Sequence, residues 1–183
     1  MFSKKVIIGI LVLVFSLVLS SNVYSAVLIN EILANGLNDP DYEWVELFNN
    51  GSTAINLTNW NISETASSNF TLNTIILANS FIILTPDFKT FNATYPNVNA
   101  SGMKIINITT SNFNLADSSG EVRLYNSSGA LVDSIAYAQA SGKTFENVSI
   151  GRYPDGSSST FNISTLTPGA KNDNQVPKLN KVD

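Results

Sequence analysis

The sequence contains no cysteine and no histidine, and these two absences exclude whole classes of chemistry. Without cysteine there is no disulfide, thiolate nucleophile, lipoprotein acylation or cysteine-based metal site. Without histidine the chain lacks the commonest general base near neutral pH, and Ser-His-Asp and Cys-His catalysis are impossible. We therefore expect a non-enzymatic protein that is stable through core burial alone, which its 183 residues permit.

Charged residues are also few, at 13% of the chain, and the N-terminus has none beyond Lys4 and Lys5 until after Ala26. The two lysines precede Val6–Leu19, fourteen uncharged residues, in the order typical of a secretory signal peptide. As a helix this run spans only about 21 Å, less than a hydrocarbon core of ~30 Å. The length favours a cleaved signal peptide over residues 1–25, with an uncleaved membrane anchor as the alternative. We expect a domain over residues 26–172 and a flexible polar tail over 173–183.

Cleavage after Ser25 would change the charge balance. Removing Lys4 and Lys5 from the ten basic residues leaves eight against fourteen acidic residues, a net charge of −6. An acidic surface repels phosphate backbones, so we expect no nucleic-acid partner. With no second apolar span, we also expect no membrane crossing after cleavage. The sequence thus predicts a secreted or cell-surface protein, whose partner is an unknown protein or cell-surface glycan.

Short runs rich in Val, Ile, Thr, Phe and Tyr are separated by Gly, Asn, Ser and Pro along the rest of the chain. These runs recur at intervals of about ten residues, which favours a β-sandwich over a βαβ fold. No stretch shows a helical period long enough for a major helix. The predicted strands are Ala26–Leu33, Glu43–Phe48, Ala54–Asn61, Asn69–Leu77, Phe81–Thr85, Met103–Thr109, Glu121–Tyr125, Leu131–Tyr137 and Ser149–Tyr153.

Two patterns give these strands finer detail. Asn50-Gly51 stands between two strands and predicts a hairpin, because both residues tolerate positive φ. The strand at Glu43–Phe48 is apolar on both faces, with Val45 and Leu47 on one of them. A strand of this kind is expected near the middle of its sheet, covered on both sides.

Six segments share a recognisable order and spacing: VLINEILA (27–34), YEWVELFNNG (42–51), INLTNWNIS (55–63), EVRLYNSSGALVDSIAYA (121–138), SIGRYPDG (149–156) and TPGAKN (167–172). Together they resemble the lamin tail domain family, and the chain looks like a secreted prokaryotic, stand-alone member, with archaea as one candidate source. The resemblance implies an immunoglobulin-like β-sandwich. It also points to Asn30, Glu31, Trp44, Glu46, Trp60 and Arg152 as structural motif residues. The sequence shows neither the rod nor the prenylated cysteine of nuclear lamins, and no attached hydrolase domain, so those roles are not expected.

Three glutamates, Glu31, Glu43 and Glu46, are the candidates for acid–base chemistry. Glycosidases use paired carboxylates at set separations, so a carboxylate-only hydrolase is one interpretation. The favoured interpretation is structural: Glu31 and Glu46 accept backbone hydrogen bonds or pair with Arg152, because a buried carboxylate needs such partners. No catalytic residue is predicted.

Alternating acidic residues, Asp39, Asp41 and Glu43, form a candidate calcium loop. Calcium takes hard oxygen ligands from such loops, but the ligand count and glycine placement of an EF-hand are missing. A solvated turn at Asp39-Pro40 is the favoured alternative. No other cofactor is predicted.

An aromatic platform for sugars is the basis of the alternative function, a carbohydrate-binding β-sandwich module. Its candidates are Trp44, Trp60, Phe48, Tyr125 and Tyr153. Tryptophan in immunoglobulin-like folds is more often part of the core, and we expect this of both Trp44 and Trp60.

Ten asparagines stand in Asn-x-Ser/Thr sequons, where chance alone would give about five for this composition. The excess suggests a glycoprotein exposed at the cell surface. A polar β surface from A/T-rich codons is the alternative. The glycosylation candidates are Asn50, Asn56, Asn61, Asn69, Asn92, Asn99, Asn107, Asn126, Asn147 and Asn162.

Overall fold

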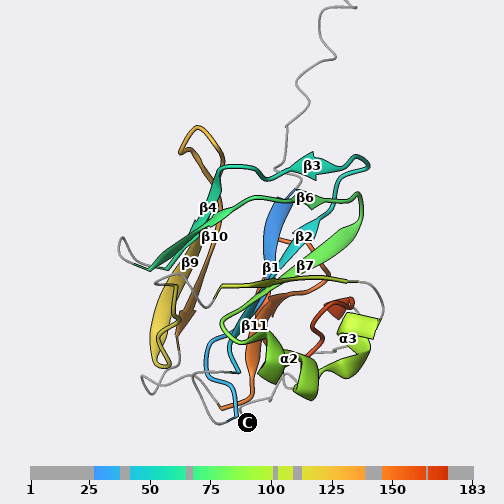
Figure 1. The fold of residues 1–183 in the computed structure, drawn as a ribbon. Coiled ribbons are helices and arrows are strands. Elements are labelled where there is room, and N and C mark those ends of the chain that lie inside the picture. The colour runs from blue at the N-terminus through green and yellow to red at the C-terminus, as the bar shows by residue number, and fades with distance from the viewer. Residues whose placement is uncertain are drawn as a thin grey trace, which may run out of the picture.

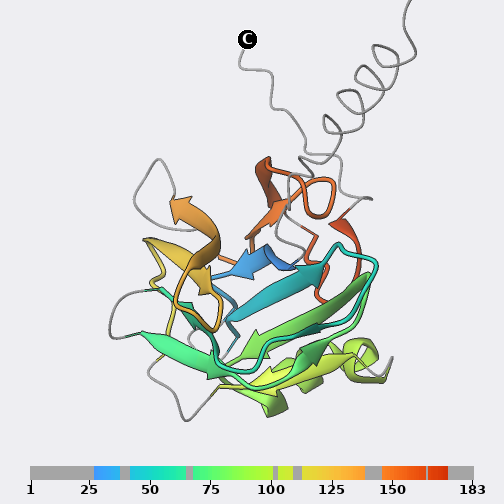
Figure 2. The same ribbon diagram turned by 90° about the horizontal axis from the view of Figure 1, so that it is seen from above.

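A computed structural model describes residues 27–37, 42–64, 68–100, 103–108, 113–138, 146–163 and 165–172. Over these residues the chain forms two β-sheets packed face to face, with two short helices on the outer side of the larger sheet (Figure 1). The view from above separates the two layers (Figure 2). The predicted immunoglobulin-like β-sandwich is confirmed. The predicted signal peptide and tail lie outside the described residues.

The larger sheet has six strands in the order β12-β11-β1-β2-β7-β8, and the smaller has four in the order β10-β9-β4-β5. All neighbours are antiparallel except β7 and β8. A further pair joins β3 to β6. The bounds are β1 Val27–Leu33, β2 Trp44–Asn49, β3 Ile55–Asn56, β4 Trp60–Ser63, β5 Asn69–Leu72, β6 Ile75–Ile76, β7 Ser80–Thr85, β8 Lys104–Asn107, β9 Ser119–Tyr125, β10 Leu131–Ala138, β11 Ser149–Arg152 and β12 Thr160–Ile163.

Strand β2 lies inside the larger sheet and is buried along its whole length, which confirms the prediction from its two apolar faces. Val45 and Leu47 join the core between the sheets. Trp44 joins a second apolar cluster with Phe91 on the opposite face. That cluster is covered by helices α2 (Phe88–Thr94) and α3 (Pro96–Ala100).

A β-bulge in β1 sets which side chains face which layer. Ile29 is opposite Leu47, but the next register pair is Glu31 with Glu46, so Asn30 is the extra residue. This insertion lets Ile29 and Ile32 both enter the core between the sheets, although simple alternation would separate them. It also turns Glu31 toward the outer face.

Several sequence predictions need correction. The predicted strands Ala54–Asn61 and Asn69–Leu77 are each two strands, because the chain passes between sheets within them. Strand β12 and helices α2 and α3 were not predicted. Asn50-Gly51 does not close a hairpin, since β2 pairs with β1 and β7. The turn between β9 and β10 does, with Gly129 at a φ of 81°. Neither described helix has the length and apolar content needed to cross a membrane.

Candidate functional site

Two glutamates lie side by side on the outer face of the larger sheet. Glu31 and Glu46 are opposite each other across β1 and β2, and both are fully buried. Glu31 accepts hydrogen bonds from the hydroxyls of Ser149 and Thr167, the latter at 2.8 Å. Glu46 accepts from Asn30 Nδ2 at 2.8 Å and from the backbone N–H of Gly169 at 2.6 Å. All four carboxylate oxygens therefore have a donor within the protein.

A third carboxylate, Asp155, extends this arrangement. Its Oδ1 accepts from Asn30 Nδ2 at 2.9 Å and from the backbone N–H of Asn172 at 3.0 Å. The side chain of Asn172 in turn donates to the carbonyl of Arg152 at 3.0 Å. Together these bonds fix residues 165–172, here called the C-terminal segment, against the sheet. We call the following set the carboxylate network: Asn30, Glu31, Glu46, Ser149, Asp155, Thr167, Gly169 and Asn172.

The surroundings of Glu31 and Glu46 favour their protonated forms. Burial raises the pKa of Glu31 from 4.5 to about 7, although the Ser149 and Thr167 hydroxyls act in the opposite direction. Burial, followed by the nearby charge of Glu31, raises the pKa of Glu46 well above its usual value. Like charges this close resist double ionisation, so the pair binds its first proton at a higher pH than an isolated glutamate does.

Gly151 leaves the space that the carboxylate network needs. It is opposite Glu31 in the pairing of β1 with β11. A Cβ at this position would lie 2.5 Å from Ile163 Cδ1, 2.9 Å from Asn172 Nδ2 and 3.2 Å from Glu31 Cγ. The small residue at 151 is therefore required by close approach of three side chains.

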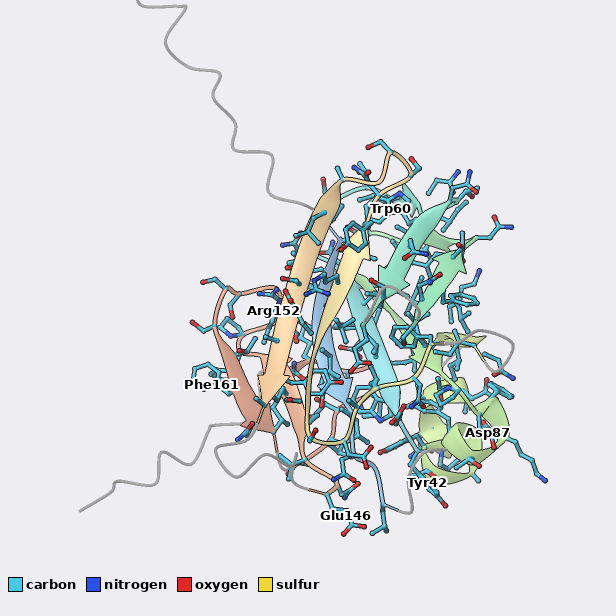
Figure 3. The ribbon with its side chains drawn as sticks, turned by 90° about the vertical axis from the view of Figure 1, so that its left-hand side faces the viewer. Tyr42, Trp60, Asp87, Glu146, Arg152 and Phe161 are labelled. Carbon is cyan, nitrogen blue, oxygen red and sulfur yellow. The ribbon has the colours of Figure 1, made fainter. Side chains whose placement is uncertain are left out.

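Arg152 does not pair with Glu31 or Glu46, so that part of the prediction is wrong. It forms an ion pair with Asp133 of β10, with nitrogen–oxygen distances of 2.8 and 3.0 Å. Arg152 Nε also donates to the carbonyl of Ile29 at 2.7 Å, and Asp133 accepts from the Ile29 N–H at 2.7 Å. The pair thus joins the two sheets at the bulge in β1, and Arg152 lies beside β10 in Figure 3.

All three candidate glutamates are buried, and they accept hydrogen bonds from other parts of the protein. Glu31, Glu43 and Glu46 are each at most 2% exposed. Glu43 accepts from the backbone N–H of Leu115 at 3.2 Å, which fixes a different loop. The predicted acceptance of backbone hydrogen bonds is confirmed for Glu46. The arrangement connects distant parts of the chain and presents no acid–base pair at the surface.

The predicted calcium loop is only partly visible. Asp39 and Asp41 lie outside the described residues, and Glu43 points into the interior. Within the described ranges no group of three or more acidic side chains is arranged to hold a metal ion. Calcium binding at this loop stays a prediction.

The aromatic candidates do not form one platform. Trp44 is 1% exposed and meets Tyr95 edge to face, so its predicted place in the core is confirmed. Trp60 is half-buried and packs against the core near one end of the sandwich (Figure 3). Phe48 stacks on Phe81 with ring centroids 4.6 Å apart. The remaining candidates are Tyr125, in β9, and Tyr153, which meets Phe161 edge to face.

All ten sequon asparagines lie among the described residues, and none of them is buried. At Asn56 the Oδ1 accepts a hydrogen bond from the hydroxyl of Thr58, two residues on, at 2.7 Å. At Asn61 and Asn147 the corresponding hydroxyls, of Ser63 and Ser149, are buried. The sequons therefore differ in the accessibility of the Ser or Thr hydroxyl at their third position.

An open apolar groove, which the sequence did not predict, lies where β6, β7 and β8 meet. Its volume is about 490 Å³, and Phe81, Met103 and Lys104 are among its lining residues. Ile75 and Leu77, also in its lining, are 54% and 64% exposed. The apolar run at residues 75–77 is the sequence feature that could have indicated the groove, but the same run is equally typical of a buried strand.

Comparison with known families gives one result. The sequence model of the Lamin Tail Domain matches residues 20–139. No curated protein matches the chain. The matched range contains Glu31 and Glu46, whereas β11, β12 and the C-terminal segment lie beyond it.

Proposed function

Because the chain belongs to the lamin tail domain family, a family of non-enzymatic immunoglobulin-like domains, we propose that it is an interaction module outside the cell. The observation that carries this proposal is the carboxylate network. Glu31 and Glu46, which were candidate catalysts in the sequence, instead hold β1, β2 and the C-terminal segment together. What remains for function is the surface of a rigid sandwich.

Location outside the cell is supported by two independent features. The N-terminal sequence has the order of a signal peptide. The sequons are about twice as frequent as chance predicts, and none of their asparagines is buried. A glycosylated, exported protein accounts for both features.

We propose that the partner is a protein, with an apolar anchor that fits the groove beside β6. Exposed Ile75 and Leu77 supply the apolar contact, and Lys104 at the same groove supplies a charge that an acidic group of the partner would meet. A sugar platform has less support, because Trp44 is in the core.

Export is tested by the intact mass of the protein recovered from the medium or the cell surface of an expressing cell. We expect a chain that starts at Ala26. A chain that keeps residues 1–25, or that stays inside the cell, would contradict the proposed location.

The partner surface is tested by a photoreactive amino acid placed at Leu77 in the full secreted chain. Its matched control is the same amino acid at Leu131, which is 56% exposed but lies on the other sheet. We expect a cross-linked protein from position 77 only, lost when Lys104 is replaced by Glu. Equal cross-linking at both positions, or none at 77, would rule out the groove as the binding surface.

A further inference from the structure

The open edges of the two sheets have few charged residues. Among the described strands, the outermost are β12 and β8 in the larger sheet and β5 and β10 in the smaller. Edge strands are usually protected from pairing with other chains by lysines, bulges or inward charges. Strands β12 and β5, with the sequences TFNI and NFTL, have no charged residue, and β8 has only Lys104.

These edges are also apolar enough to be hazardous. Phe161 of β12 is 36% exposed and lies at the outer margin of the molecule in Figure 3. Ile105 and Ile106 in β8, and Phe70 in β5, are half-buried. Neutral strands with exposed apolar side chains are templates for edge-to-edge association.

Each of these three strands contains an exposed sequon asparagine: Asn162 in β12, Asn107 in β8 and Asn69 in β5. The fourth edge, β10, has no sequon but has other protection. Its register shifts at a bulge near Val132, and its Asp133 is turned inward to Arg152. Three edges thus have a sequon, and the fourth has the usual protective features.

Interior strands show the opposite pattern. Within the described interior strands of both sheets, the one sequon asparagine is Asn61 of β4. It is half-buried, and the hydroxyl-bearing Ser63 of its sequon is only 8% exposed. Within the two sheets of the sandwich, the accessible in-strand sequons therefore follow the edges. Asn56, which is also exposed, lies in β3, which pairs with β6 outside these two sheets.

We propose that Asn69, Asn107 and Asn162 carry N-linked glycans that cover the sheet edges and prevent pairing with a second copy of this chain. The inference rests on the proposed export, since the sugar donor is met on the outer side of the membrane. Asn107 and Lys104 are at opposite ends of β8, and Asn107 is not among the residues that line the groove beside β6.

The modification is a group transfer from a lipid-pyrophosphate-linked oligosaccharide. The asparagine Nδ2 forms a bond to the anomeric carbon of the first sugar, and the bond from that carbon to the pyrophosphate oxygen breaks. The lipid pyrophosphate leaves with the electron pair, and one amide proton passes to a base of the transferase. The asparagine keeps its other amide hydrogen.

The test expresses the full chain in a secreting, N-glycosylating cell and maps sequon occupancy by peptide mass. Three variants are then compared by size-exclusion chromatography with light scattering and by thioflavin fluorescence. The edge variant is N69Q/N107Q/N162Q. A second edge variant, T71A/T109A/S164A, removes the same sequons but keeps the asparagines. The control, N50Q/N92Q/N99Q, removes three sequons outside the sheets.

We expect all three edge asparagines to be occupied in the unmodified protein. Both edge variants should lose the monomer peak and form thioflavin-positive oligomers, whereas the control stays monomeric. Bare edge asparagines in an exported, cleaved chain would overturn this proposal alone, as would edge variants that stay monomeric. A chain that is never exported would overturn both this proposal and the proposed location.

Discussion

Two buried acidic sites join distant parts of this sandwich, and they differ in what neutralises the acid. Between the sheets, Asp133 meets the guanidinium of Arg152, and the two side chains are 11% and 8% exposed. On the outer face, Glu31 and Glu46 are surrounded by neutral donors, with no cation among the hydrogen bonds described. Asp133 is therefore neutralised by the charge of Arg152, whereas Glu31 and Glu46 are neutralised by binding a proton.

The difference sets how each site responds to change. Removing one partner of a buried ion pair strongly lowers the free energy of unfolding, because the remaining charge stays buried without a counter-charge. The carboxylate network instead responds to pH, because burial raises the pKa values of Glu31 and Glu46, which therefore bind protons more tightly when folded than when unfolded. One site depends on its partner residue and the other on solution conditions.

The largest effect is expected from Arg152→Met, which leaves Asp133 buried without a cation. We expect the free energy of unfolding to fall by about 3–5 kcal/mol in urea denaturation. Arg123→Met is the control, because the Arg123–Glu121 pair is about one-third exposed and should contribute less than about 1 kcal/mol. Equal losses from the two variants would remove the distinction between the inner pair and a surface pair.

The next effect concerns pH. Because the pKa of Glu31 is raised from 4.5 to about 7 on folding, its contribution is full below about pH 4.5 and is lost as the pH rises through 7. This loss is on the order of 3 kcal/mol for a shift of this size. The double variant E31Q/E46Q should flatten the dependence of urea stability on pH between about 5 and 8.

Glu146→Gln, at an exposed position, is the control and should leave the slope unchanged. A wild-type protein that becomes more stable as the pH rises through this window would contradict the assignment of the proton to the carboxylate network.

A smaller effect is expected from Thr167→Val, which removes one donor to Glu31. An unsatisfied buried acceptor costs about 1–3 kcal/mol. Hydrogen exchange should quicken in the C-terminal segment and stay slow in β9, on the other sheet. Thr165→Val, at an exposed position, provides the matched comparison. If both variants behave alike, the Thr167 hydroxyl does not fix the segment.

The smallest effect is optical. Trp44 belongs to the outer apolar cluster and Trp60 packs against the core between the sheets. In the W60F variant, acrylamide quenching of Trp44 should increase as the pH rises through about 7, where Glu31 ionises. In the W44F variant, acrylamide quenching of Trp60 should be stronger at low pH than that of Trp44 in W60F. It should not change with pH. A pH response from Trp60 alone would place the sensitive site between the sheets.

Much of the fold could be read from local pattern. The predicted strand Glu121–Tyr125 lies within β9, and the two apolar faces of β2 correctly placed it inside a sheet. Helices α2 and α3 escaped because seven and five residues are too short to establish a helical period. The turn at Asn50-Gly51 misled because turn residues mark a change of direction without saying which strand comes next.

The site was harder to predict because its contacts are remote in sequence. Glu31 was recognised as a buried acid, but Thr167, its donor, is 136 residues away. Arg152 was one of two partners predicted for the buried glutamates, the other being backbone donors, yet it pairs with Asp133 from the other sheet. Residue type predicts that a buried acid has a partner, and only the topology decides which one.

The position of β1 has a consequence for the order of folding. It is the first described strand, yet it lies between β2 and β11, a strand that begins more than a hundred residues later. The larger sheet cannot close around β1 until nearly the whole chain is available, which makes closure slow. Under the export proposed above, β11 can pair with β1 only after nearly the whole chain has crossed the membrane.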